Sequence, residues 1–226
     1  MDDFKNLNWP GWPLDDNPHG EEFDLPARKR MLTGSEMLLP FLRKHKKNMG
    51  ENILEIGPFF YPLINPKEFP NINIFYWEND YHVLKYLSKK YKNKSVYPIH
   101  CDLNRIEGNS LLKLKLETQK YFRNINQRSI SFDAVIISHV LNYIDYKLLL
   151  LVLKEFLRKD GLIFINNVVD YGLPAFFSDM RPKSIPSTIK SVKETGYIIM
   201  EKEIFESPNK KHQKNKRLIL VAKSNG

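Results

Sequence analysis

The sequence contains very little cysteine and no long hydrophobic run. Its 226 residues include one cysteine, Cys101, which excludes an internal disulfide and a CxxC-type zinc site. The most apolar stretch, residues 146–157, is interrupted by Lys147 and Lys154 and falls short of the roughly 18 residues that cross a bilayer. Residues 1–10 carry acids where a signal peptide has a basic start and then an apolar core. We therefore expect a cytoplasmic protein with no membrane partner.

Arginine is scarce among the basic residues. Nine of the 35 basic side chains are arginines, and the formal net charge is +9. Lysine lacks the forked donors with which arginine grips phosphates and bases. Two basic clusters stand out, at residues 43–47 and 210–214, and runs of this kind are usually solvated surface. Nucleic acid is thus an alternative partner that the composition does not favour.

The composition changes near residue 50. Residues 1–49 start with an irregular, proline-containing stretch that includes Trp9 and Trp12. An amphipathic pattern then predicts a helix within residues 26–47, with Gly34 as its candidate break. We interpret residues 1–49 as an extension that acts as a lid, and residues 50–226 as one domain.

Short apolar segments alternate with helical patterns after residue 50. The last two, joined by a polar loop, predict an antiparallel hairpin, and the others predict a parallel sheet with helices on both faces. A helix is expected over residues 146–158, with Gly161 as its C-terminal cap. The expected strands are residues 53–56, 72–77, 95–99, 134–137, 162–165, 197–200 and 218–221. The fold class is therefore α/β.

Polar side chains follow the expected parallel strands. Ligands of open α/β sheets bind beyond the carboxyl ends of the strands, so these side chains are candidates for a common site. In chain order they are Glu55 with Gly57, Glu78 with Asp80, Asp102, Ser138 with His139, and Asn166 with Asn167.

Over residues 52–223 the sequence resembles the class I S-adenosylmethionine-dependent methyltransferases. The segment NILEIG at residues 52–57 resembles the first motif of that family, and residues 132–141 resemble its fourth strand and the following loop. Glu78 is placed like the family's ribose-binding acid, and Asp102 like the acid that accepts from the adenine amino group. The resemblance implies a seven-stranded Rossmann-like sheet and S-adenosylmethionine as cofactor. The implied cofactor residues are Glu55, Gly57, Pro58, Phe59, Glu78, Asp80, Asp102, Leu103 and Ser138.

The segment after the first strand departs from the family pattern. Three glycines are usual there, but Gly57 is followed by Pro58, and Phe59 and Tyr61 take the places of the other two. Four prolines between residues 58 and 70 predict an irregular crossover rather than a long helix. The absence of GxGxxG disfavours a nicotinamide dehydrogenase. Two alternatives remain open, a loop that admits the cofactor and a non-catalytic binding protein in which the aromatic loop blocks it.

Methyl transfer requires a positioned nucleophile and, for some acceptors, a base. His139 is the candidate catalytic base, since the ordinary pKa of histidine lies near neutrality. Candidate substrate residues are Asn142, Tyr143, Asn166 and Tyr171. No magnesium or zinc pattern is evident. The sequence favours transfer to a hydroxyl or amine of a small molecule, sugar-related compounds included, with an RNA methyltransferase as the alternative.

Overall fold

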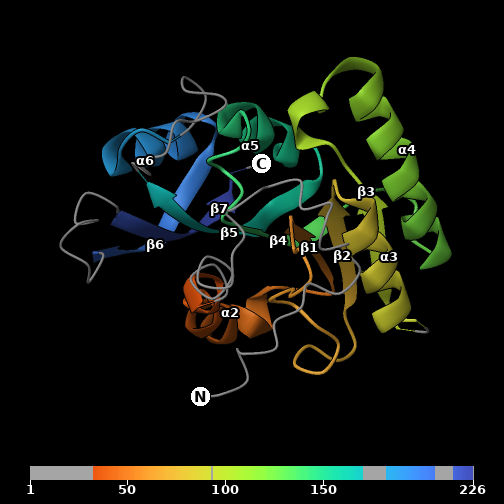
Figure 1. The fold of residues 1–226 in the computed structure, drawn as a ribbon. Coiled ribbons are helices and arrows are strands. Elements are labelled where there is room, and N and C mark those ends of the chain that lie inside the picture. Colours follow the sequence, from red (N-terminus) through yellow and green to blue (C-terminus); the bar gives the residue numbers. More distant parts are fainter. Residues whose placement is uncertain (1–32, 93, 170–181, 207–215, 226) are drawn as a thin grey trace, which may run out of the picture.

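Seven strands form one mixed sheet in the computed structural model, which describes residues 33–92, 94–169, 182–206 and 216–225. The strand order is β3-β2-β1-β4-β5-β7-β6 (Figure 1). Every neighbouring pair is parallel except the two that involve β7, which runs opposite to the rest. This confirms the predicted fold class. The strands are β1 Asn52–Ile56, β2 Asn73–Glu78, β3 Val96–His100, β4 Phe132–Ser138, β5 Leu157–Val169, β6 Tyr197–Glu206 and β7 Lys216–Ser224.

Helices cover both faces of the sheet (Figure 1). Because successive strand side chains point to opposite faces, the core is divided into two clusters of buried residues. Helices α2 (Leu39–His45) and α3 (Tyr81–Lys90) pack on one face, which we call the α2 face. Helices α4 (Gly108–Asn124), α5 (Tyr146–Lys154) and α6 (Ile185–Glu194) pack on the other. Short 3-10 turns lie at Lys46–Asn48 and Leu103–Arg105.

The segment from 155 to 161 differs from the prediction. Helix α5 ends at Lys154, and Gly161 lies inside β5 rather than at a helix cap. Leu157 already pairs with Phe132, and the register then shifts so that Leu162 pairs with Ala134. The prediction was wrong because the residues between these two pairings bulge out of the ladder, and a local sequence pattern carries no sign of which strand they join.

The N-terminal helical region is interrupted at a different residue from the predicted one. Residues 33–36 are helical, residues 37–38 form a turn, and α2 follows. Gly34 is therefore not the break. Pro40 in the first turn of α2 has no backbone N–H to continue a preceding helix, which accounts for a break just before it. Residues 1–32, with Trp9 and Trp12, and the basic cluster at residues 210–214 lie outside the described residues.

In the described part of the chain, no helix is both long enough and apolar enough to cross a membrane.

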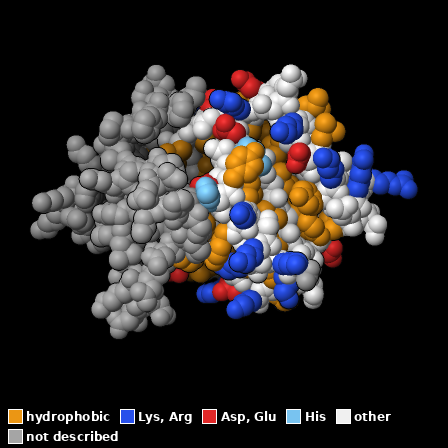
Figure 2. Space-filling view, turned by 45° about the vertical axis from the view of Figure 1, so that its right-hand side comes forward, with side chains coloured by type: hydrophobic (Ala, Val, Ile, Leu, Met, Phe, Trp, Pro, Cys, Tyr) orange, Lys and Arg blue, Asp and Glu red, His pale blue; other side chains and the backbone are white. Residues whose placement is uncertain are grey.

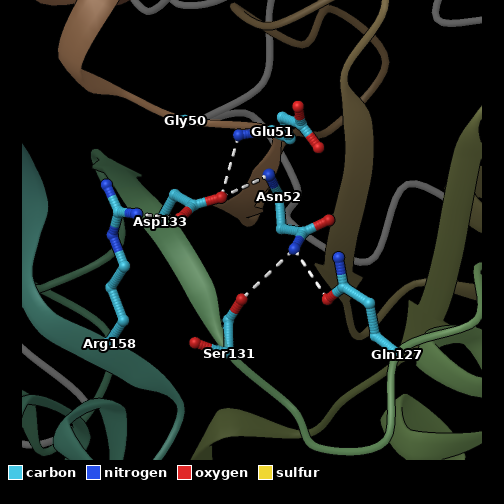
Figure 3. Close-up of a pocket in the computed structure, with 7 residues that line it drawn as sticks. All are labelled: Gly50, Glu51, Asn52, Gln127, Ser131, Asp133 and Arg158. Atoms are coloured by element: carbon cyan, nitrogen blue, oxygen red, sulfur yellow. Dashed lines mark hydrogen bonds and ion pairs between the residues drawn. The ribbon is translucent and has the colours of Figure 1, made fainter.

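A network of polar side chains joins β1 to β4 at the amino ends of the strands. A hollow of about 490 Å³ lies at this place (Figure 3). The Asp133 carboxylate accepts the backbone N–H groups of Glu51 and Asn52, both at 2.8 Å, through Oδ2. Its Oδ1 lies 2.8 Å from Nη1 of Arg158. The Asn52 amide donates to Gln127 at 2.9 Å. These groups bind one another, so the hollow is a structural junction at the edge opposite to the expected cofactor site.

Replacing Asp133 with alanine is expected to lower the free energy of unfolding by about 2 kcal/mol, since two backbone N–H groups lose their acceptor in a largely buried place. The matched variant is Arg158→Ala. The Arg158 side chain is 46% exposed, so its loss should cost about 1 kcal/mol or less. Urea unfolding of both variants measures the difference. Equal losses would show that the ion pair, rather than the N–H groups, gives Asp133 its effect.

Candidate functional site

Gly57 connects the carboxyl ends of β1 and β2. Its backbone N–H donates to the carbonyl of Trp77 at 2.8 Å, and its φ of +60° lies in the left-handed region. A Cβ added there would lie 2.7 Å from Cγ2 of Val140, in the loop after β4. The turn therefore requires glycine for its conformation and for the close approach of that loop.

Glu55 holds the crossover loop that replaces a helix. No helix forms between residues 57 and 72, which confirms the prediction from the prolines. The Glu55 carboxylate, buried at 3% exposure, accepts the backbone N–H groups of Leu63 at 2.9 Å and Ile64 at 3.0 Å. The Tyr76 hydroxyl donates to the Ile64 carbonyl at 2.5 Å. In this structure both Glu55 oxygens bind the loop, so a direct contact with cofactor stays a prediction.

Glu78 lies at the end of β2 on the same face as Glu55. Its Oε1 accepts the N–H groups of Asn79 at 2.8 Å and Asp80 at 3.1 Å, and its Oε2 accepts that of Phe59 at 3.1 Å. Two carboxylate oxygens offer about four acceptor directions. Three are used by backbone, which leaves room for one further donor such as a ribose hydroxyl.

Pro58 and Phe59 follow Gly57 at this end of the sheet, where the backbone of Phe59 binds Glu78. The φ of Phe59 is +53°, so the loop keeps a glycine-like backbone at a position where the family has glycine. A non-glycine residue in this region costs roughly 1–2 kcal/mol, and the hydrogen bond to Glu78 offsets part of that cost. Pro58 is buried, whereas Phe59 is half-buried and its ring packs edge-on against Phe60 with the ring centroids 5.2 Å apart.

Burial perturbs both glutamates. It raises the pKa of Glu55 to about 7, against the lowering effect of the hydrogen bonds from Ile64 and Leu63. It also raises the pKa of Glu78 to about 7, although three backbone N–H groups favour the ionised form. Both carboxyls therefore titrate near neutral pH, and their charge is available only where solvent or a ligand compensates for burial.

The next two predicted acids cap helical turns at the same edge. Asp80 accepts the N–H groups of His82 at 2.7 Å and Val83 at 3.4 Å as the N-cap of α3. Asp102 follows β3 and accepts the N–H of Asn104 at 3.0 Å. The Asp102 side chain is 31% exposed, with Oδ2 3.6 Å from Nε of Arg105. Asp102 and the neighbouring Leu103, which is partly buried, keep surface that a ligand can reach.

A second group of polar residues gathers at the ends of β4, β5 and β7. Asn166 is fully buried, donates to the Gly34 carbonyl at 2.7 Å and contacts the Ser138 hydroxyl at 3.3 Å. Ser138 in turn donates to Ser35 at 3.3 Å. The segment 33–36 is thus seated on the carboxyl ends of β4 and β5, the place that the predicted lid would occupy.

Arg217, at the start of β7, completes this group. Its Nη1 donates to Asn166 Oδ1 at 2.8 Å, lies 3.0 Å from Nε2 of His139 and donates to the Gly34 carbonyl at 3.3 Å. A Cβ on Gly34 would lie 2.3 Å from Nη2 of Arg217, so a side chain there would displace the guanidinium from this position. Arg217 is not among the site residues predicted from the sequence. The signal that would have found it is strand alternation, which puts Arg217, Ile219 and Val221 on the α2 face.

His139 is partly buried and has a left-handed backbone with a φ of +62°. Burial and the nearby Arg217 cation lower its pKa to about 3. At neutral pH the ring is therefore uncharged, and Nε2 serves as an acceptor for the guanidinium. A base with so low a pKa takes up a proton weakly. The catalytic role of His139 thus stays a prediction. For His139 to act as a base, the guanidinium of Arg217 would have to move away from its ring.

The remaining substrate candidates lie apart from this group. Asn142 donates to the Val168 carbonyl at 3.0 Å and accepts from the buried Asn167 at 3.0 Å. Oδ1 of Asn167 has no hydrogen-bond partner in the described part of the chain. Tyr143 is 48% exposed, and Tyr171 lies outside the described residues. The side chains of Asn166 and Asn167 point to opposite faces of the sheet. The two asparagines therefore do not belong to one site.

The sequence matches no protein-family model and no curated protein sequence. Solved structures do match. The chain superposes on the N-methyltransferase NodS from Bradyrhizobium japonicum bound to S-adenosylhomocysteine with a TM-score of 0.59 and 14% identity, covering 97% of this chain and 94% of that one. For a Burkholderia thailandensis 1,6-didemethyltoxoflavin-N1-methyltransferase the TM-score is 0.57 at 12% identity, with 85% and 79% covered.

One similar structure belongs to a protein that is named for a different activity. The [4+2]-cyclase SpnF gives a TM-score of 0.61 at 11% identity, with 84% of this chain and 80% of that chain covered. Likeness at such identities establishes the arrangement of strands and helices, while the reaction depends on the residues of the site. The chain therefore has the Rossmann-like fold of the class I S-adenosylmethionine-dependent methyltransferases.

Proposed function

We propose that the protein binds S-adenosylmethionine and transfers its methyl group to a hydroxyl or amine of a small molecule. The proposal rests on one observation, that the Gly57 turn lies next to Glu78. The Gly57 N–H binds the carbonyl of Trp77, the residue before Glu78, so a glycine turn and a buried acid meet at the edge where this fold binds ligands.

The residues present fit the cofactor. Glu78 keeps acceptor capacity for ribose, Asp102 offers a partly exposed carboxylate for the adenine amino group, and the Gly57 turn lets backbone approach the methionine part. When bound, S-adenosylmethionine supplies a methyl group on a sulfonium. The protein then has to position the acceptor and exclude water. Ser138, at the end of β4, lies between these residues and the group around Asn166.

The contact between Phe59 and Glu78 defines the rival function. If the loop stays closed on Glu78, the protein is a non-catalytic binding protein with a methyltransferase fold. Isothermal titration of cofactor-free protein with S-adenosylmethionine, and separately with S-adenosylhomocysteine, decides between the two. We expect micromolar binding. Absence of heat and of thermal stabilisation, in protein shown to be folded, would establish the rival.

The acceptor is best sought among small molecules. One structural neighbour, the 1,6-didemethyltoxoflavin-N1-methyltransferase with bound 1,6-didemethyltoxoflavin and S-adenosylhomocysteine, supports this class. The polar group of Ser138, Asn166 and Arg217, which in this structure binds Gly34 and Ser35, would supply donors and acceptors to a polar acceptor molecule. Transfer of a labelled methyl group to sugars and other hydroxyl or amine compounds tests the proposal directly.

We expect His139 to act as a positioning residue for Arg217, and NMR titration of its imidazole measures this. Its signals should not shift between pH 5 and 8, because the pKa lies near 3. Arg217→Met should raise that pKa, since the nearby cation contributes to the lowering. His139→Gln identifies the signals and keeps an acceptor for the guanidinium. If the wild-type imidazole titrated with a midpoint near pH 6.5 and His139→Gln abolished turnover, His139 would be the catalytic base instead.

A further inference from the structure

The positive charge of the protein is concentrated in one segment. Residues 81–128 contain eleven lysines and arginines and three acids, a net charge of +8, whereas the whole chain carries +9. The other 178 residues are thus nearly neutral. A lysine-rich composition alone would spread the charge along the chain. The concentration therefore points to a local function.

The fold places this segment along one edge of the molecule. It comprises α3, the edge strand β3 and α4, and α3 and α4 both contact β3. We call this surface the basic edge. Figure 2 looks onto this side of the molecule, where Lys and Arg side chains outnumber acidic ones. Of the eleven basic side chains, ten are exposed, and only Arg105 and Lys115 form ion pairs within the described residues.

Aromatic rings lie among these lysines. The Tyr81 side chain is 68% exposed and its ring stacks on that of His100, with centroids 4.2 Å apart and planes 9° from parallel. Lys90 lies 5.1 Å from the ring centre of Tyr86 and 5.3 Å from that of Tyr91. A flat ring left in solvent and held by a second ring presents an apolar face that a nucleobase can cover.

The stacked pair lies beside the proposed cofactor site. Tyr81 directly follows Asp80, and His100 pairs in register with Glu78 at the carboxyl end of the sheet. A strand held along the basic edge would therefore pass the entrance of the site. Helix α4, with 17 residues, extends this edge for roughly 25 Å, which is long enough for several nucleotides.

We propose that the basic edge binds single-stranded RNA, with lysines on the phosphates and the Tyr81–His100 pair stacked on a base. This goes beyond the proposed function, because it assigns a binding surface outside the cofactor pocket. Single strands are favoured over duplexes because a paired base does not expose a face for stacking. The edge also exposes Leu112 and Leu116, which would suit an anionic lipid surface, so vesicles are part of the test.

The test is fluorescence anisotropy with a labelled, mixed-sequence single-stranded RNA of about 20 nucleotides, at several salt concentrations. The charge variant combines Lys85→Glu, Lys89→Glu and Lys113→Glu. We expect it to lose at least tenfold in affinity and to flatten the slope of log affinity against log salt by about 2, at about 0.7 per phosphate contact. Tyr81→Ala should weaken binding about tenfold with the salt slope unchanged.

The matched control reverses three exposed lysines elsewhere, with Lys159→Glu, Lys193→Glu and Lys202→Glu. It changes the net charge equally and should stay within twofold to threefold of wild type. Titration with S-adenosylmethionine and a thermal melt of every variant show whether the cofactor site and the fold are intact, so failure of this inference is separable from failure of the proposed function.

Three results would overturn the inference. If both triple variants lost the same RNA affinity, the binding would be due to the net charge of the protein and not to the basic edge. Unchanged binding by Tyr81→Ala would remove the stacking site and with it the preference for single strands. Equal or tighter binding to an RNA duplex, or to vesicles containing phosphatidylserine, would assign the basic edge to that partner instead.

Discussion

Replacing Glu78 with glutamine is expected to weaken S-adenosylmethionine binding roughly 10- to 150-fold, the equivalent of 1.5–3 kcal/mol for hydrogen bonds to a charged group. The carboxylate already accepts three backbone N–H groups, and its remaining acceptor direction is the one proposed for ribose. Glutamine keeps the size of the side chain but replaces one acceptor oxygen with a donor. Isothermal titration of folded wild-type and variant protein measures the loss.

The control for Glu78 is Glu51→Gln, which removes the same charge from an exposed side chain at the opposite edge of the sheet. The affinity of Glu51→Gln for S-adenosylmethionine should match that of wild type. Because the pKa of Glu78 lies at about 7, wild-type affinity should also rise between pH 6 and 8 relative to Glu78→Gln, a comparison that cancels the cofactor's own titration. Unchanged affinity in the variant at every pH would exclude Glu78 from the site.

Replacing Glu55 with alanine is expected to lower the free energy of unfolding by about 4 kcal/mol. The backbone N–H groups of Leu63 and Ile64 are buried and would have no acceptor, at about 1–3 kcal/mol each. A cavity next to Tyr76 adds to the cost. Urea unfolding provides the measurement, and a loss below about 1 kcal/mol would contradict the role of Glu55 in holding the loop.

Glu55 also makes stability depend on pH. Its pKa is about 7 in the folded protein and 4.5 as the ordinary value, so between these values the folded state binds more protons than the unfolded state. The free energy of unfolding should then fall as pH rises through this window, by about 3 kcal/mol for this group. Glu78 acts in the same direction.

Glu55→Gln isolates that contribution. His139, with its lowered pKa, opposes the two glutamates below pH 6.5, because protonation there favours the unfolded state. The wild-type slope is therefore a sum of three groups. The difference between wild type and Glu55→Gln, measured at pH 5.5 and 8.0, should change by about 2 kcal/mol, the part of the full effect that falls between these two pH values. A constant difference would show that the Glu55 carboxyl does not titrate in this range.

The sequence predicted the sheet well because buried parallel strands have a local signature. The apolar runs at residues 53–56 and 134–137 lie within β1 and β4, and the prolines after Gly57 correctly predicted a crossover without a helix. Local patterns failed at Gly161, where the deciding interaction is the pairing of Leu157 with Phe132. These two residues lie far apart in sequence, and nothing in the segment itself specifies their register.

The candidate site was predictable as a set of strand ends but not in its contacts. Alternation along each strand puts Glu55, Glu78 and Ser138 on the same face, and that much follows from sequence. The partners of these side chains do not. Phe59 reaches Glu78 across 19 residues, and Arg217 reaches His139 across 78. Such contacts arise when loops from different strands close over one edge.

By itself, then, the amino-acid sequence determined the order of the strands along the chain, their burial, the helix-free loop and the sign of the charge. Tertiary structure alone decided that Glu55 holds this loop, that burial together with Arg217 keeps His139 uncharged, and that α3 and α4 bring the lysines of residues 81–128 to one edge. The physical reason is range. Periodicity and proline act within a few residues, whereas burial, pKa shifts and shared surfaces depend on groups that only folding brings together.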